Sequence, residues 1–294
     1  AGDIAVGRAN LVVAGGMGMA DRITSSAASA DWGRLVISGG TLTATNGIDG
    51  STFGSVTFAI DLNGGTLRVN QIAGGGGTEN VSFNGTQIIA KANQANFIAG
   101  MDAGGATIDA GGLKVDSNGF TLTAPQALDG TGDVVKSGSG KLTLSGANTY
   151  SGNNVVNAGE LVLSSSASGT GSITVADGAA VGVSATIAVG AQLKPTNATF
   201  GTTAAGTSLN LNIGNAGGSN PTTSIMDVTG NLTLAGNVTV NVYGSQFSAA
   251  VMPLVTYNAA TRSGAGVFTL GTLPNGVIAT IVDDPNYYGA GLGL

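Results

Sequence analysis

Apolar residues occupy every second position in many short runs of this chain, and turn-forming residues separate the runs. Such alternation is typical of β-strands with one buried face. Asn-Gly and Asp-Gly pairs between the runs favour tight turns. The pattern predicts strands along the whole chain, with cores that include Leu35–Ile37, Thr66–Val69, Val81–Phe83, Leu142–Leu144, Leu209–Ile213, Val238–Val242 and Val277–Val282. Gln87–Ala99 has a mixed pattern, for which we expect a short helix.

A Gly-x-Leu phrase recurs along the chain and indicates an internal repeat. It places leucines at Leu42, Leu67, Leu142 and Leu161. These spacings fit one or several periods of roughly 19–25 residues, a length typical of solenoid coils. Many of the strands are also spaced by about 8–12 residues, which fits the hairpins of a β-sandwich. The spacing therefore leaves two all-β architectures open.

Gly138–Leu163 reads as strand, turn, strand, turn and strand, with no room for a helix. Its motifs are Gly-Ser-Gly-Lys-Leu-Thr-Leu-Ser-Gly-Ala-Asn-Thr-Tyr-Ser-Gly and Val-Asn-Ala-Gly-Glu-Leu-Val-Leu. The segment resembles the autotransporter-associated β-strand repeat. Val228–Gly236, Pro253–Tyr257 and Gly266–Gly276 resemble the segment that commonly ends such repeat proteins. The resemblance implies stacked β-coils in an exported bacterial protein, so it favours the solenoid, and it implies no reaction.

The distribution of charge suggests a boundary near Lys194. Of ten basic residues, Arg262 alone follows it, and the acids beyond it are Asp227, Asp283 and Asp284. We expect an all-β fold, a β-solenoid (β-helix-like) body with a C-terminal β-sheet domain or cap. The expected parts are an N-terminal cap or donor segment at 1–34, a solenoid repeat region at 35–194 and a C-terminal β-rich domain at 195–294.

Composition narrows the chemistry available to the chain. It has 51 glycines, 9% charged residues, no cysteine and no histidine. Disulfides, thiolate metal sites and histidine-based catalysis are therefore impossible. A net charge of −6 disfavours nucleic-acid binding, and no apolar run is long enough to span a membrane as a helix. We expect that the protein is not an enzyme and that it binds no cofactor or metal. We also expect an extracellular or cell-surface location. The start at Ala1 fits a mature secreted protein, or a boundary set for other reasons.

Carboxylates are the remaining candidates for chemistry. Asp102, Asp109 and Asp116 are evenly spaced, and Asp129 lies close to Asp133 in the sequence. Glycoside hydrolysis needs two carboxylates about 5–10 Å apart, which coil stacking can supply. Aspartate is also a common turn residue, and this interpretation is favoured here. Asp283-Asp284 is similarly interpreted as a solvated turn rather than a calcium site. We therefore assign no catalytic, cofactor-binding or metal-binding residue.

A solenoid has two ends at which strand edges lack partners. Head-to-tail pairing of such ends gives an open filament. Our main hypothesis is a secreted structural protein that assembles with itself into a filament or surface layer by β-strand addition of its N-terminal segment. The residues expected to take part are Ile4, Val6, Leu11, Val12 and Val13. The alternatives are a monomeric adhesin passenger that binds surface glycans and a β-helix polysaccharide lyase or hydrolase.

Overall fold

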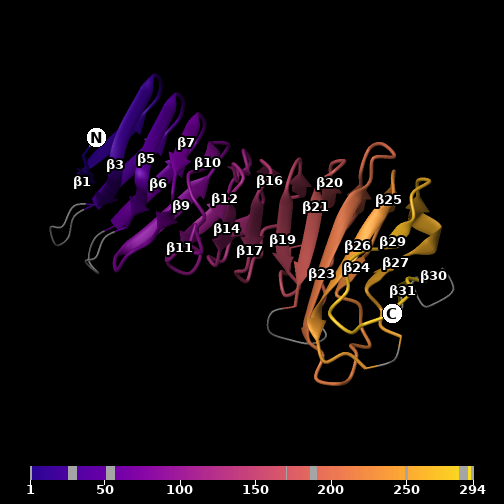
Figure 1. Cartoon of the computed structure of the whole chain (residues 1–294). Helices are drawn as coiled ribbons and strands as arrows, with labels where there is room; N and C mark the ends of the chain where they lie inside the picture. Colours follow the sequence, from indigo (N-terminus) through magenta and orange to yellow (C-terminus); the bar gives the residue numbers. More distant parts are fainter. Residues whose placement is uncertain are drawn as a thin grey trace. The chain divides into compact units, whose positions relative to one another are not determined.

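The computed structural model describes residues 2–25, 32–50, 57–169, 171–185, 191–248, 251–284 and 291–292 (Figure 1). Within these residues the regular secondary structure is almost entirely β-strand, and the one helical element is the 3-10 turn η1 (Ala259–Thr261). No helix in the described part is long and apolar enough to cross a membrane. The chain divides into two compact units, unit 1 (Ala1–Gly152) and unit 2 (Asn153–Leu294).

Unit 1 is built from rows of parallel strands, to which successive turns of the chain add neighbouring strands. Bonds between adjacent coils join residues such as Ser117 and Ser137, 20 apart, and Thr121 and Asn93, 28 apart. Row A holds β1 (Ile4–Val6), β3 (Met17–Ser25), β5 (Thr41–Asp49), β7 (Thr66–Val69), β10 (Gln87–Ala90), β13 (Leu113–Asp116) and β16 (Val134–Ser137), with β8 (Ile72–Ala73) beside β5 and β11 (Ile98–Ala99) beside β8. Row B holds β2 (Ala9–Val13), β4 (Trp32–Ile37), β6 (Thr57–Leu62), β9 (Thr78–Phe83), β12 (Ala106–Ile108) and β15 (Asp129–Gly130). A third row pairs β14 (Thr121–Ala124) with β17 (Lys141–Leu144).

Unit 2 is likewise built from rows of parallel strands. Row A of this unit holds β18 (Asn154–Val156), β20 (Ile173–Val175), β22 (Ala198–Phe200), β25 (Leu232–Leu234) and β28 (Arg262–Ser263). Sheet C holds β19 (Glu160–Ser164), β21 (Ala180–Ser184), β23 (Thr207–Asn215), β26 (Val238–Ser245) and β29 (Phe268–Leu270). β24 (Met226–Val228) pairs with β27 (Val255–Tyr257), and β30 (Asp283–Asp284) forms an antiparallel pair with β31 (Gly291–Leu292). The parallel coils confirm the predicted all-β solenoid, whereas the division at residues 34 and 194 stays a prediction.

Inward-facing side chains stack in register to form the core. Leu42, Leu67, Ile88 and Val115 occupy equivalent positions on successive coils of unit 1, and all are buried. Full burial of such side chains contributes about 1.5–3 kcal/mol each. Lys136 takes the next position of this column and is 0% exposed.

Lys136 is accommodated in the core because carbonyl oxygens solvate its charge. Its Nζ donates to the carbonyl oxygens of Ser137 and Gly138, both at 2.7 Å. A buried ammonium is costly unless its donors are bonded. The lysine therefore fixes the turn that follows β16 while it fills the core.

Two sequence predictions are wrong. Gln87–Ala99 contains no helix, because β10 and β11 pair there with the neighbouring coils. Val277–Val282 contains no strand, although its pattern is strongly strand-like. Strand formation needs a neighbouring edge, and no described strand lies in register beside this segment.

Candidate functional site

The residues expected to mediate self-assembly lie on the first coil of unit 1, which we define as β1, β2 and Met17–Ala20 of β3. Ile4 and Val6 are in β1, which pairs with the second half of β3. Leu11, Val12 and Val13 are in β2, which pairs with β4. The structure therefore places both groups on the same end coil. Val6 is buried, whereas Val12 is 54% exposed.

The outward face of sheet C in unit 2 carries an array of amide and hydroxyl side chains. Parallel register aligns Ser184 with Asn212 and Asn212 with Tyr243. Next to them, Asn210 aligns with Asn241. We call the set Glu160, Asn210, Asn212, Asn241 and Tyr243 the sheet C face. Its strands contain no lysine or arginine, and Tyr243 is 43% exposed.

Hydrogen bonds connect the side chains of the sheet C face across several coils. The Asn210 amide donates to the Glu160 carboxylate at 2.7 Å, and the Asn241 amide donates to Asn210 Oδ1 at 2.8 Å. Asn241 Oδ1 then accepts from the backbone N–H of Thr272 at 2.7 Å. This series of hydrogen bonds holds the amide planes of Asn210 and Asn241 in fixed orientations. Each of the two amides has a further N–H and a further lone pair for other partners.

Gly182 gives Glu160 room to reach Asn210 across the intervening coil. It stands in register between Val162 and Asn210. A Cβ atom at Gly182 would lie 2.9 Å from the Val162 side chain and 3.1 Å from Glu160 Oε1. Sequence analysis missed this site. The sequence feature that could have indicated the sheet C face is the alternation of Asn with apolar residues in Leu209–Ile213 and Val238–Val242.

The candidate acids are distributed over different rows, and Asp129 lies within β15. Asp109 follows β12 of row B and accepts a hydrogen bond from the Ser82 hydroxyl. Asp116 ends β13 of row A and accepts from the backbone N–H of Asn118 at 2.7 Å. The described residues contain no group of three acids that could hold a metal ion. The favoured interpretation of Asp109 and Asp116 as turn residues thus agrees with their contacts.

Asp177 shows most clearly how an aspartate stabilises two turns of adjacent coils. Its carboxylate accepts from the hydroxyl and the N–H of Thr202, at 2.8 and 3.0 Å. It also accepts from the hydroxyl and the N–H of Thr203. These bonds, the Thr202 hydroxyl above all, hold the pKa of Asp177 below its ordinary value of 3.8.

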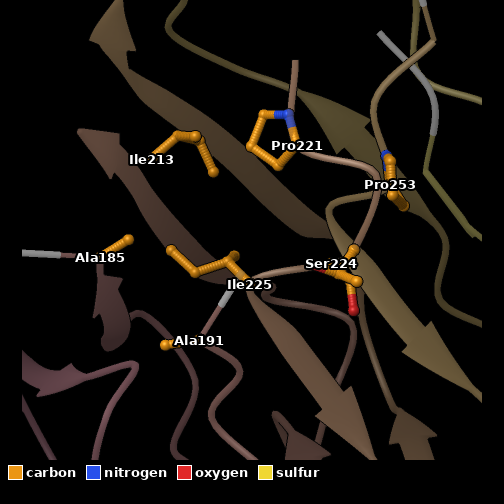
Figure 2. A pocket seen from close by; sticks show the side chains of 8 residues that line it. Ala185, Ala191, Ile213, Pro221, Ser224, Ile225 and Pro253 are labelled. Carbon is orange, nitrogen blue, oxygen red and sulfur yellow. The ribbon is translucent and has the colours of Figure 1, made fainter. Parts of the chain in front are cut away.

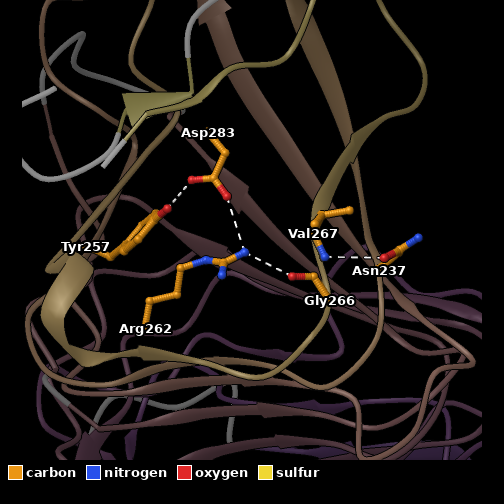
Figure 3. A network of polar contacts seen from close by, with 6 residues as sticks. All are labelled: Asn237, Tyr257, Arg262, Gly266, Val267 and Asp283. Atoms are coloured by element: carbon orange, nitrogen blue, oxygen red, sulfur yellow. Dashed lines mark hydrogen bonds and ion pairs between the residues drawn. The ribbon is translucent and has the colours of Figure 1, made fainter. Parts of the chain in front are cut away.

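A polar network fixes the segment that follows β29 to the strands of unit 2 (Figure 3). The Tyr257 hydroxyl donates to one oxygen of Asp283, and Arg262 donates to the other at 3.3 Å. Arg262 also donates to the carbonyl oxygen of Gly266 at 2.9 Å. Burial, and then the Asp283 carboxylate, raise the pKa of Tyr257. Asp283 is thus part of a structural clasp. Asp284, the other half of the proposed turn, has no described side chain.

A small pocket of about 10 Å³, enough for about one water molecule, opens in unit 2, and its lining is largely apolar (Figure 2). The lining residues are Ala185, Ala191, Ile213, Pro221, Thr223, Ser224, Ile225 and Pro253. Ile213 and Ile225 are among the lining side chains that Figure 2 labels. The Ser224 hydroxyl is already bonded to Gln192 and Thr256, at 2.9 Å each. The pocket therefore lacks the convergent free polar groups of a binding site.

Comparisons with known proteins agree with this architecture. Residues 134–163 match the family described as passenger-associated-transport-repeat. The chain is 30% identical over 179 residues to the adhesin BmaC autotransporter of Brucella suis biovar 1 (strain 1330). That similarity covers 53% of this chain, and the chain spans 5% of the length of this curated relative. No solved structure matches the chain. The chain is therefore a β-solenoid protein that carries a match to the passenger-associated-transport-repeat and is similar over part of its length to an autotransporter adhesin.

Proposed function

We propose that this chain is a cell-surface passenger of the adhesin type and that it binds surface glycans through the sheet C face. The observation that carries the proposal is the hydrogen-bonded array of Glu160, Asn210 and Asn241 beside the exposed Tyr243. The passenger repeat and the adhesin relative support an adhesin-like role rather than an enzymatic one. The same relative supports a secreted or cell-surface location.

The chemistry of the sheet C face suits a neutral carbohydrate. Sugar hydroxyls both donate and accept hydrogen bonds, as side-chain amides do. A tyrosine ring offers an apolar surface for the C–H groups of a sugar and a polar tip for its hydroxyls. Because the face has few charges, a neutral ligand would desolvate little charge when it binds.

The repeating coils also suit a polymeric ligand. Adjacent strands place equivalent side chains about 4.8 Å apart, so a chain of sugars can meet similar groups along the row. Each contact is individually weak in water, with a net gain of about 0.5–1.5 kcal/mol per hydrogen bond. Several linked contacts raise the overall affinity through effective concentration.

A glycan array probed with the purified chain tests the proposal. We expect binding to neutral glycans, and we expect Tyr243→Ala and Asn210→Ala to weaken it at least tenfold. Trp32→Ala is the matched control, since Trp32 is also an exposed aromatic residue but lies on β4 in unit 1. An array without binding, or binding that these two sheet C face variants leave unchanged, would refute the assignment of this face.

A further inference from the structure

Three basic side chains lie on the outward face of row A in unit 1, on coils that have neighbours on both sides. Arg68 is in β7, Lys114 is in β13, and Lys91 directly follows β10. The residue before each of them is buried, so the three side chains point outward. Arg68 and Lys91 are exposed, and Lys114 is half-buried. We call Arg68, Lys91 and Lys114 the basic face.

The cations of the basic face have no ion-pair or hydrogen-bond partner for their side chains among the described residues. Arg22, also in row A, is by contrast 3.0 Å from the Asp49 carboxylate. The guanidinium and ammonium donors of the basic face are therefore available to a partner from outside the chain.

Parallel register places the three cations on successive coils. Arg68 is the register partner of Ile89, and Lys91 follows two residues later in the chain. Gln87, on the same coil as Ile89, is the register partner of Lys114 on the next coil. Strands lie about 4.8 Å apart and rise about 3.3 Å per residue. The Cα atoms of Arg68 and Lys91 are therefore about 8 Å apart, and those of Arg68 and Lys114 about 12 Å apart.

Strands β7, β10 and β13 contain one acid, Asp116, which does not neutralise the basic face. The Asp116 carboxylate accepts from the backbone N–H of Asn118 at 2.7 Å and lies against Gly138. It forms no ion pair with Lys91 or Lys114. The face therefore keeps a local excess of positive charge on a chain whose net charge is −6. Such an excess attracts an anionic partner.

We propose that the basic face binds a carboxylated polysaccharide, in which uronic acids alternate with neutral sugars. The Arg68 guanidinium can hold a carboxylate through two parallel N–H donors, and each lysine supplies a point charge. Cations about 8–12 Å apart suit a polymer whose charges are sparse. Duplex DNA carries one charge per about 1.7 Å, and the net charge of −6 repels so dense a polyanion.

The neutral side chains between the cations suit the sugar rings of such a polymer. Thr66 is the register partner of Gln87, and the hydroxyl and amide of these residues can donate to and accept from sugar hydroxyls. Ile89, half-buried beside Arg68, offers apolar surface to sugar C–H groups. The basic face in unit 1 is thus a second binding surface, distinct in its ligand chemistry from the sheet C face in unit 2.

Biolayer interferometry on immobilised hyaluronate tests the proposal, since this polymer alternates a uronic acid with a neutral sugar. Hyaluronate with its carboxyl groups reduced to alcohols is the matched ligand control. Lys91→Gln is compared with Lys194→Gln, because both remove one exposed lysine and Lys194 lies in unit 2. A triple variant replaces Arg68, Lys91 and Lys114 with Gln. Circular dichroism verifies that each variant keeps its β-structure.

We expect wild type to bind hyaluronate at low ionic strength and to lose affinity as salt is added. Lys91→Gln should weaken binding about two- to fivefold, the value of one exposed ion pair, and the triple variant at least about tenfold. Lys194→Gln should bind as wild type does. Tyr243→Ala should also bind hyaluronate as wild type does, which separates this proposal from that for the sheet C face.

Wild type that does not bind hyaluronate at low salt would overturn the proposal. Binding that carboxyl reduction or the triple variant leaves unchanged would do the same. Tighter binding of wild type to heparin or to duplex DNA than to hyaluronate would equally overturn it, because the partner would then be a more densely charged polyanion.

Discussion

Leu11→Ala and Leu35→Ala, two truncations in adjacent coils, test whether the first coil of unit 1 is less well covered than the second. Leu11 and Leu35 are partners in the register of β2 and β4, but only Leu35 is fully buried. Leu35→Ala removes buried methyl groups and leaves an enclosed cavity, so we expect a loss of about 2–5 kcal/mol in the free energy of unfolding. Leu11→Ala removes a half-covered side chain without enclosing a cavity. We expect it to cost less than about 1.5 kcal/mol, half of the value for full burial.

Urea unfolding followed by tryptophan fluorescence is a suitable assay. Trp32 is the lone tryptophan and belongs to β4, the strand that contains Leu35. Its fluorescence therefore reports on the coils in which both substitutions lie, even if a repeat structure unfolds in stages. Measurements at low protein concentration avoid any contribution from association. Equal losses for the two variants under these conditions would refute the reasoning, because Leu11 would then be as well covered as Leu35.

Three further predictions concern the polar contacts. Lys136→Ala should lower the free energy of unfolding by about 2–5 kcal/mol, since it opens a cavity and removes the donor to two carbonyl oxygens. Urea titration measures this loss, and an unchanged stability would contradict the role of the lysine. Asp177→Asn should destabilise the protein near neutral pH, because a lowered pKa means that the charged form is stabilised by folding. The difference in Tm between wild type and Asp177→Asn should shrink as the pH falls below 3.8 and vanish below the lower pKa that Asp177 has in the folded state. A difference in Tm that stays constant with pH would contradict this role of Asp177. Asp283→Asn should lower the pKa of Tyr257 towards 10.0 without fully restoring it, since burial remains the larger cause. Ultraviolet titration against Tyr257→Phe measures this, and no change would argue against the clasp.

Local patterns predicted most strands because each strand needs only an alternation that one sheet face can bury. Leu35–Ile37, Thr66–Val69 and Leu142–Leu144 all lie inside observed strands. The strand predicted at Val277–Val282 is absent although its alternation is clear, because no described strand pairs with this segment. Pairing depends on residues far away in the sequence, and propensity does not record their positions.

The candidate sites were harder to predict because they depend on register between coils. The Asn210–Asn241 bond joins residues 31 apart, and the Asn210–Glu160 bond joins residues 50 apart. No local motif marks either pair. The burial of Lys136 was equally difficult to predict, because a charged residue is rarely found in a core. Its position becomes understandable only when the carbonyl oxygens that accept from its Nζ are known.

Adherence of cells that display this chain on their surface tests the adhesin proposal most directly. Displaying cells are compared with cells that display Tyr243→Ala, on a glycan-bearing surface with and without periodate oxidation of its sugars. The account predicts adherence that both the substitution and the oxidation reduce to the level of non-displaying cells. Adherence no greater than that of non-displaying cells, or adherence that survives oxidation of the sugars, would contradict it.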